Sequence, residues 1–518
     1  MSSQEKSQKL GVFAGAFFLI TYVVGAGIFT TVQDVFLKIR SFWPTLGLWA
    51  ACGVLCMIGA FCYAELACML PGEGGEHLYL GHGFGPWAVR LYDWMSFFVL
   101  RPSSIAFFSM KFVIILWATV TTVEPSALKI LGCVSLFIAG VTLLTIVLPS
   151  LSGKLEKVFT WIKIFSLFTI VVLSLGYVCW RRDILGRNLP GYTPIPDDKG
   201  KIPERKIGEA ITLAVLTFDG WNGLNTVAGR FANPSKTIPS AIVLGTGFIT
   251  GIYLMVALSY FFVFDFGNGE FIEKNYSIFQ ALAAAFISKE QWGKWIGNVF
   301  ILAAVFSSTL AWISSGVEAF EVAVADGSLP KFLQKKNKIF KTPHITLILQ
   351  ALLTIVFCLG PYGLAKLTTK DLSEEILISK ITDAASFFGV FPYCIFYVMT
   401  VMVLIREKHW APSPITTHSF KAFLPLPYIY TVATCILIGL LAVLNFQTGE
   451  RFTIIVTVSL MVLMLVMVAI SVFGDKSFAK RKLLLEKQKA VEVEKIATTL
   501  DLDKETPLPP QVVEKTFL

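Results

Sequence analysis

Long apolar runs alternate with short polar segments over most of the chain. Each run is rich in Leu, Ile, Val, Phe and Ala and is long enough to cross a bilayer, for which a helix needs about 20 residues. Twelve runs of this kind occur, at residues 11–37, 43–69, 87–120, 127–149, 157–180, 207–230, 240–266, 293–324, 344–361, 380–405, 425–446 and 452–474. Because a helix satisfies its own backbone hydrogen bonds in lipid, the pattern predicts an all-α membrane protein with twelve transmembrane helices.

The composition agrees with a bilayer as the solvent. Of the 518 residues, 55% are hydrophobic and 15% are charged, which is too apolar for an ordinary soluble domain. The Lys and Arg residues are scattered over short loops, so nucleic acid is not expected as a partner. We divide the chain into a polar N-terminus (1–10), one membrane domain (11–474) and a charged tail (475–518). The first run is too long for a signal peptide and is expected to remain as a span.

Basic residues predict the orientation. An even number of spans puts both termini on one side, and Lys and Arg cluster there after the eighth and tenth runs and at the start of the tail. By the positive-inside rule this side is cytoplasmic. The loop 181–206, predicted to be external, disagrees, with seven basic against four acidic residues. Asn275 opens an N-x-S sequon in another predicted external loop, a position compatible with glycosylation.

Two glycines interrupt the first run, in the stretch Val24, Gly25, Ala26 and Gly27. Glycine costs about 1 kcal/mol relative to alanine inside a helix, and it lets the backbone leave the helical path. In lipid, the N–H and C=O groups that such a break frees are tolerated only where they line a cavity or meet a ligand. We therefore expect this stretch to form one half of a binding site.

The sixth run is interrupted in the same way, at Phe218, Asp219, Gly220, Trp221 and Asn222. Broken helices at corresponding places in two halves of a membrane protein are the best sequence indication of a transporter's midplane site. Spans one and six are five apart, so the breaks predict a five-plus-five inverted repeat with two spans appended. Free N–H groups at the start of a half-helix suit a carboxylate, and free carbonyls suit an ammonium. Together they describe an amino acid.

Asp219 is the most informative side chain of the second break. A carboxylate at the centre of a membrane helix costs about 2.5–3.5 kcal/mol on insertion scales, so we expect it to have a task. It either contacts the cationic group of a substrate or titrates. The alternative is that it caps the N–H groups of the second half-helix.

Several motifs resemble those of a known family. The stretch Gly25–Phe29 is similar to the first-span signature of the amino acid–polyamine–organocation superfamily. Within it, the chain resembles the light subunits of heteromeric amino-acid transporters at Trp49–Val54, Tyr63–Leu66, Gly74–Glu76, Arg101–Ser104 and Asn233–Pro234. The resemblance runs from residue 11 to about 425. It implies a LeuT-like fold with broken helices 1 and 6, and sodium-independent exchange of amino acids at the plasma membrane.

The chain departs from that family in two places. The light subunits usually carry a cysteine between spans three and four that forms a disulfide with a single-span heavy chain. Residues 119–126 contain no cysteine, which argues against a covalent heavy-chain partner. Family members also tend to carry a Glu pair before the Asn-Pro of span six. This chain has Gly229 and Arg230 there, which puts the family's cytoplasmic gating contacts in question.

The resemblance also implies roles for two charged residues. Relatives that move dibasic amino acids have a similar Asp-Gly-Trp-Asn run, which implies that Asp219 admits cationic substrates. Lys163, alone in the fifth run, matches a Lys that lies near where sodium-coupled relatives bind sodium. The implication is that its charge replaces the ion, and the alternative is that it snorkels to the cytoplasmic face.

Three polar positions in the spans have open interpretations. Arg101 either pairs with carbonyls freed by Pro102 or steers substrate carboxylates. Ser307 and Ser308 either ligate an ion or pack helices together. The cysteines at 52, 56 and 62 are expected to be small packing residues, since no His lies near them. The glycine-rich loop 71–77 lacks the Lys-Ser/Thr of a phosphate loop and predicts either a cytoplasmic hairpin or a short re-entrant segment.

The chain ends in Thr516, Phe517 and Leu518. A Thr two residues before a C-terminal Leu is the pattern that PDZ domains bind as an added edge strand. The tail therefore has a PDZ scaffold as a candidate partner; the alternative is an unstructured end without one.

We interpret the chain as a sodium-independent exchanger of neutral and, through Asp219, cationic L-amino acids that works by alternating access. One alternative is a proton-coupled symporter in which Asp219 or Lys163 titrates. Another is a membrane sensor or scaffold that binds amino acids without transporting them. An enzyme, a cofactor or a metal is not expected, because the histidines lie in or beside loops without metal spacing and meet no nearby nucleophile.

Overall fold

The computed structural model describes most of the chain, and its regular elements are helices. The described residues are 11–25, 27–70, 72, 74–121, 123–181, 183, 206–231, 233–264, 278–287, 290–368, 373–409, 420–447 and 451–473. Within them, ten helices are long and apolar enough to cross a membrane. This supports the predicted all-α membrane protein.

The ten long helices follow the apolar runs closely. They are α3 (Phe42–Met69), the continuous segment Pro86–Val120, α7 (Ala127–Val147), α8 (Pro149–Trp180), α11 (Pro234–Val263), α14 (Glu290–Ala325), α15 (His344–Thr368), α16 (Glu374–His409), α17 (Pro425–Gln447) and α18 (Arg451–Phe473). The segment Pro86–Val120 consists of α5 (Pro86–Met95), the π-helical turn η1 (Ser96–Leu100) and α6 (Arg101–Val120). The ninth run, expected to be short, is extended because α15 continues past Pro361 to Thr368.

The first and sixth runs are each divided in two. The first gives α1 (Val12–Val23) and α2 (Gly27–Ile39). The sixth gives α10 (Ile207–Phe218) and η2 (Gly223–Arg230). The expectation of a second α-helical half in the sixth run is wrong in detail, since η2 is a 3₁₀-helix. A 3₁₀-helix is the tighter form used for short pieces and hinges.

Three short elements lie between the long helices. The segment after α3 contains α4 (Glu76–Phe84), which packs against α5 and α16. The other two are α13 (Ile278–Ile287) and η3 (Lys331–Gln334). None of the three is long enough to span a bilayer.

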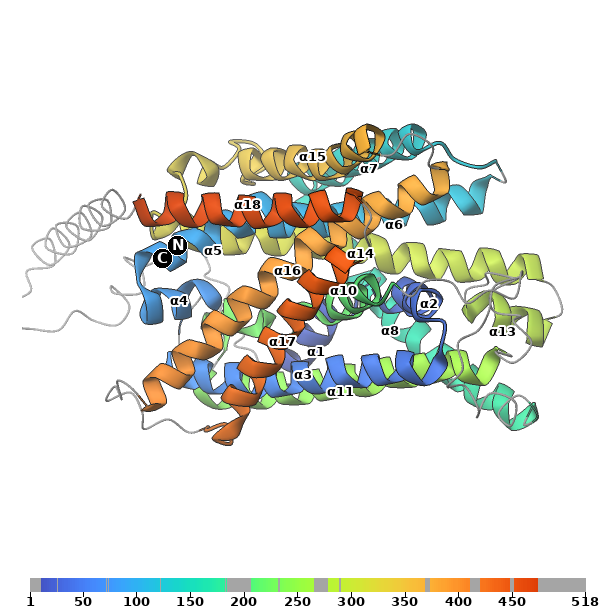
Figure 1. Ribbon diagram of the computed structural model, residues 1–518, viewed down its shortest axis with the longest axis horizontal. Coiled ribbons are helices and arrows are strands. Elements are labelled where there is room, and N and C mark those ends of the chain that lie inside the picture. The colour runs from blue at the N-terminus through green and yellow to red at the C-terminus, as the bar shows by residue number, and fades with distance from the viewer. Residues whose placement is uncertain are drawn as a thin grey trace, which may run out of the picture.

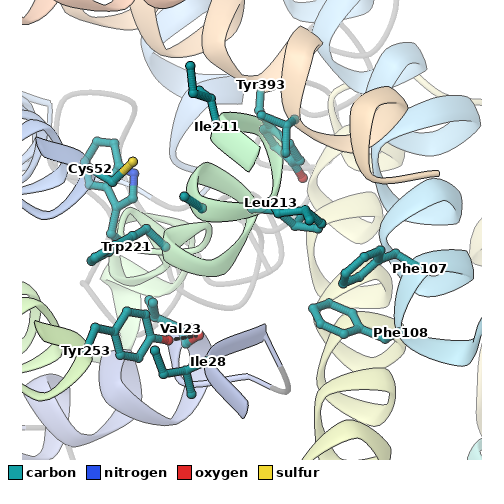
Figure 2. Packing of buried hydrophobic residues seen from close by; sticks show 14 of the residues in the cluster. Val23, Ile28, Cys52, Phe107, Phe108, Ile211, Leu213, Trp221, Tyr253 and Tyr393 are labelled. Atoms are coloured by element: carbon teal, nitrogen blue, oxygen red, sulfur yellow. Dashed lines mark hydrogen bonds between the residues drawn. The ribbon is translucent and has the colours of Figure 1, made fainter. Parts of the chain in front are cut away.

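The two divided runs lie inside the bundle. Helix α11 packs along α3 and against α1, and the two long helices run side by side in Figure 1. Helix α10 packs against α2 and α16 near the centre of the molecule. Side chains from both runs join one buried cluster, part of which is drawn in Figure 2. Large apolar side chains such as Leu136, Phe165 and Leu465 are exposed on outer helices, as expected for a surface that faces lipid.

Candidate functional site

The break in the first run is held by side chains from other helices. The last turn of α1 has carbonyls that its own helix does not satisfy. The carbonyl of Thr21 accepts a hydrogen bond from Lys163 Nζ of α8 at 3.0 Å. The carbonyl of Val23 accepts one from the Tyr253 hydroxyl of α11 at 3.1 Å. The chain can therefore leave the helix at Val24 without unpaired carbonyls at these two positions.

The glycines of this break permit close approach of helices. A Cβ at Gly25 would lie 3.1 Å from the hydroxyl oxygen of Ser308 on α14. A Cβ at Gly27 would lie 2.9 Å from Thr217 Oγ1 and 3.2 Å from Thr217 Cα on α10. Beside that contact, the hydroxyls of Thr31 and Thr217 lie 2.6 Å apart. Gly27 thus allows α2 to begin directly against the end of α10.

The second break combines backbone strain with side-chain chemistry. Helix α10 ends at Phe218, and Asp219 has the extended ψ of 147°. Gly220 follows with φ +96°, a left-handed conformation that favours glycine. Asp219 Oδ1 accepts hydrogen bonds from the Gly220 N–H at 2.9 Å and from the Tyr397 hydroxyl at 2.6 Å. Asp219 Oδ2 is buried and has no hydrogen-bond partner among the described residues.

One hydroxyl joins the two breaks. Tyr253 is fully buried, and its hydroxyl lies 3.1 Å from the Val23 carbonyl and 3.2 Å from the Thr217 carbonyl. These carbonyls belong to the last turns of α1 and α10. Figure 2 shows the Tyr253 ring directed at Val23, next to Ile28 on the other side of the first break. The two interruptions are therefore one structural unit.

A small cavity lies on the Asp219 side of this unit. It has a volume of about 30 Å³ and is lined by α3, α10, α16 and α17, which is enough for about two water molecules. Asp219 and Trp221 line it together with Tyr397. The Trp221 ring packs against the rings of Tyr397 and Tyr430 at 5.3 and 6.2 Å between centroids. The cavity is thus apolar except for a carboxylate and a few hydroxyls.

The sequence matches a known family over most of its length. A family model described as amino acid permease matches residues 10–472. The chain belongs to the amino acid permease family. This confirms the family resemblance found in its motifs.

Three relatives show which branch the permease is similar to. It is 26% identical over 407 residues to the b(0,+)-type amino acid transporter 1 of Mus musculus, covering 77% of this chain and 75% of that one. It is 25% identical over 473 residues to the cystine/glutamate transporter of Homo sapiens, covering 88% and 85%. It is 24% identical over 434 residues to the large neutral amino acids transporter small subunit 2 of Mus musculus, covering 82% and 74%.

Lys163 of the permease is buried beside the first break. Its exposed fraction is 1%, so it does not snorkel to an aqueous face. The hydroxyls of Ser307 and Ser308, proposed above as ion ligands or packing groups, donate to backbone carbonyls: Ser307 to Glu156 at 3.4 Å and Ser308 to Ala304 at 3.0 Å. Ser307 also lies 3.2 Å from Thr160 Oγ1 on α8. These bonds favour the packing interpretation of the two serines.

Arg101 at the start of α6 is buried and contacts α14. Its Nη1 donates to Ser315 Oγ on α14 at 2.9 Å, and the Tyr22 hydroxyl of α1 lies 3.2 Å from the same oxygen. The guanidinium group is 5.9 Å from the centre of the Trp312 ring. Pairing with carbonyls freed by Pro102 is not seen in the described part of the chain. The arginine is instead connected to α1 through a serine and a tyrosine.

On the side predicted to be cytoplasmic, α4 contacts the second break. Glu76, 1% exposed, accepts a hydrogen bond from Asn222 Nδ2, and the Tyr92 hydroxyl lies 3.4 Å from its other oxygen. Burial raises the pKa of the Glu76 carboxyl. The next residue, His77, lies 2.9 Å from Asp93 and 3.6 Å from Asp326. Burial alone would lower the pKa of His77, but the two carboxylates outweigh it and raise this pKa to about 10.

Sequence reasoning missed the groups that hold the site together. Tyr253, Tyr397 and Tyr22 lie in apolar runs, where a tyrosine carries no signal of its hydroxyl's partner. Glu76 was noted only within the Gly74–Glu76 motif, and nothing in the sequence indicated its burial or its contact with Asn222.

Some predicted residues cannot be placed. Ala26, the sequon at Asn275 and the C-terminal Thr516, Phe517 and Leu518 lie outside the described residues. The nine cysteines are free. Across the described ranges, no group of His, Cys, Asp and Glu side chains could hold a metal ion.

Proposed function

We propose that this permease carries amino acids across the plasma membrane by alternating access. The proposal includes twelve spans, with α1–α2 and α10–η2 counted as spans one and six, a five-plus-five inverted repeat, and both termini in the cytoplasm. The observation that carries it is the Tyr253 hydroxyl, which joins the ends of the two broken helices at 3.1 and 3.2 Å. Paired broken helices are the usual midplane site of transporters with inverted repeats.

The first break is proposed to bind the groups that all amino acids share. Helix α2 starts at Gly27 and is thirteen residues long. Its N-terminus is proposed to offer unpaired N–H groups and the positive end of the helix dipole to a carboxylate. The carbonyls of Thr21, Val23 and Thr217 each already accept one hydrogen bond, so the α-ammonium group is proposed to use the second lone pair of carbonyls at the ends of α1 and α10. Val24, Gly25, Ala26 and Gly27 are the residues proposed for this role, and they offer no charged side chain that would select among substrates.

The second break is proposed to select the substrate side chain. Asp219 Oδ2 is buried without a partner among the described residues, and Asp219 is one of the residues that line the cavity. A buried carboxylate oxygen without a partner is costly, so a cationic side chain that reaches it gains a strong interaction. We therefore propose neutral and cationic amino acids as substrates, with Phe218, Gly220, Trp221 and Asn222 shaping the pocket. Arg101 is proposed as a candidate for steering carboxylates toward the site.

Sodium independence is proposed from Lys163. Its ammonium group bonds to the Thr21 carbonyl next to the first break, 3.0 Å away. A protein cation at this place leaves no vacancy that sodium must fill. Exchange rather than net transport is proposed by analogy with the family resemblance.

The experiment is reconstitution of the purified chain into liposomes preloaded with mixed amino acids. Uptake of radiolabelled neutral, cationic and anionic amino acids is measured separately, with sodium or with choline outside. We expect neutral and cationic amino acids to be exchanged, at a rate that does not change when choline replaces sodium outside. Strict sodium dependence would refute the role of Lys163, and binding without uptake would favour the sensor interpretation.

Proton-coupled symport is the second candidate. The unpaired Asp219 oxygen favours it, because a carboxylate at a transport site can carry a proton through the cycle. Acidification of empty liposomes during uptake would support this mechanism, and uptake that requires internal amino acids would exclude it. Activity of the chain alone would also show that a heavy chain is dispensable for transport, whereas a PDZ scaffold at Leu518 would bear only on location.

A further inference from the structure

The hairpin that contains α4 makes close contacts with residues 222–226, the segment after the second break. The Gly74 N–H donates to the carbonyl of Thr226 in η2 at 3.3 Å. A Cβ at Gly75, which has φ +55°, would lie 3.2 Å from the Thr226 side chain. The carboxylate of Glu76 then accepts a hydrogen bond from Asn222 Nδ2. The inner half of the sixth run is thus held against the hairpin from residue 222 to residue 226.

The far end of α4 is fixed to a different part of the molecule. Arg406 on α16 donates to the Gly83 carbonyl, and His82 lies 3.2 Å from Glu407 of the same helix. At the near end, His77 contacts Asp93 of α5. His77 also lies 3.6 Å from Asp326, which follows α14. The hairpin is therefore attached to α5, α16 and the end of α14, and its contact with η2 is one of the contacts that join the inner half of the sixth run to these helices.

Glu76 is also connected to the proposed selectivity carboxylate. Asn222 donates to Glu76 through Nδ2, and its Oδ1 lies 3.5 Å from the Tyr397 hydroxyl. The same hydroxyl donates to Asp219 Oδ1 at 2.6 Å. A buried chain of polar groups thus links the hairpin to the substrate side of the break. Groups in a buried polar network polarise one another, so a change at one member affects the next.

We propose that Glu76 is a positioning residue. It couples closure of the carrier on its cytoplasmic side to the orientation of side chains at the substrate site. When α4 and η2 are in contact, Glu76 fixes Asn222 and, through Tyr397, the orientation of Asp219. When the inner side opens, η2 must leave the hairpin and the bond between Glu76 and Asn222 must break. This inference rests on the proposed transport function and adds a residue that lies outside the two breaks.

Removal of Glu76 should shift the conformational balance of the carrier. A contact made only in the closed-inside state stabilises that state, so its loss increases the population that is open to the cytoplasm. Fewer carriers are then open to the outside and able to bind external substrate. The apparent affinity for external substrate falls in proportion to this outward-open fraction. A residue that only supports folding would instead lower the amount of active carrier and leave the KM unchanged on both sides.

The test compares uptake and efflux by the same cells for Glu76→Ala, Glu76→Gln and the wild type, normalised to surface protein. For Glu76→Ala we expect the external KM to rise about tenfold while the internal KM does not rise. Glu76→Gln, which can still accept from Asn222, should lie between alanine and wild type. The matched control is Glu321→Gln at the end of α14, where the acid pairs with Lys336 at the surface and contacts no break.

A double-mutant cycle with Asn222→Ala gives the second measurement. If the two residues act together, the double variant Glu76→Ala/Asn222→Ala should resemble the single variant Asn222→Ala. This should hold for the external KM and for the melting temperature of the purified protein. Additive effects, or a KM that changes equally on both sides, would overturn the proposal. If Glu76→Ala does not fold, the Glu76→Gln cycle is measured in its place. A wild type that transports nothing while the melting cycle stays non-additive would refute the proposed function, not the coupling of Glu76 to Asn222.

Discussion

The two helix breaks of this permease differ in the hydrogen bonds that stabilise them. At the end of α1, the carbonyls of Thr21 and Val23 accept hydrogen bonds from the ammonium group of Lys163 on α8 and the hydroxyl of Tyr253 on α11. The break at 219–222 is held through its own side chains, which bond to α4 and α16. Under the proposed function, the first break would present mainly backbone groups to a substrate, and the second would present a carboxylate and aromatic rings.

This difference suggests a division of labour. Backbone groups recognise what all amino acids have in common, whereas side chains can distinguish one substrate from another. The Tyr253 hydroxyl lies between the two, bonded to a carbonyl of each. Substitutions in the three places should consequently have different signatures: loss of all substrates, loss of one charge class, or a uniform partial loss.

The largest effect is expected from Gly27→Leu. The new side chain would meet Thr217 of α10, since even a Cβ lies 2.9 Å from Thr217 Oγ1. We expect uptake of neutral and cationic amino acids to disappear together, measured against the carrier present at the cell surface. Gly140→Leu is the control, because a Cβ there meets nothing within 4 Å. If Gly27→Leu spared one substrate class, the first break would not serve all of them.

Asp219→Asn should separate the two substrate classes. The amide keeps the size of the side chain and can still accept from Tyr397, but it removes the charge that faces the cavity. We expect cationic uptake to fall about tenfold or more, corresponding to the loss of a charged hydrogen bond worth about 1.5–3 kcal/mol, and neutral uptake to change little. If competition assays showed that neutral and cationic uptake fall equally, Asp219 would stabilise the break and would not recognise the charge of the substrate.

Tyr253→Phe should weaken both breaks equally. The ring remains, but the carbonyls of Val23 and Thr217 lose their partner, at a cost of about 1–3 kcal/mol for a buried unsatisfied group. Neutral and cationic uptake should fall several-fold by the same factor, and the melting temperature should drop. Tyr362→Phe on α15, whose ring lies 6.0 Å from the Lys366 ammonium, is the control. A selective loss of one substrate class would contradict the bridging role.

The smallest effect is expected from His77→Gln, and it should depend on pH. The pKa of His77 is raised to about 10 by Asp93 and Asp326, so the stabilisation is full below its usual pKa of about 6.5 and is lost as the pH rises through 10. The variant should melt several degrees below wild type at pH 7 and close to it at pH 10.5. A difference that stayed constant over this range would show that the charge of His77 is not what matters.

The order of the helices could be predicted from the sequence because lipid imposes one rule on every span. The ten long helices agree with the apolar runs, and Gly25 and Gly220 indicated where two further runs would break. The 3₁₀ form of η2 was not foreseen, since its contacts with Gly74 and Gly75 come from a distant hairpin. The extension of α15 past Pro361 was missed because a proline usually ends or kinks a helix.

The chemistry of the candidate site could be predicted only in part. Asp219 and Lys163 stood out because a charge in an apolar run is costly. Tyr253 and Tyr397 did not, because a tyrosine is common in such runs and its partner is chosen by tertiary packing. Lys163 shows the same limit, since its partner, the Thr21 carbonyl, lies 142 positions away.

Lys163 has a thermodynamic consequence if it stands in for a bound ion. A cation that is tethered to the chain has no concentration difference across the membrane, and it cannot be exhausted or replenished. The carrier then draws no work from a sodium gradient. The direction of flux depends on the amino-acid gradients and, where a cationic amino acid exchanges for a neutral one, on the membrane potential. Such a permease would equalise the concentration ratios of its neutral substrates between two compartments, and it could accumulate one amino acid only by releasing another.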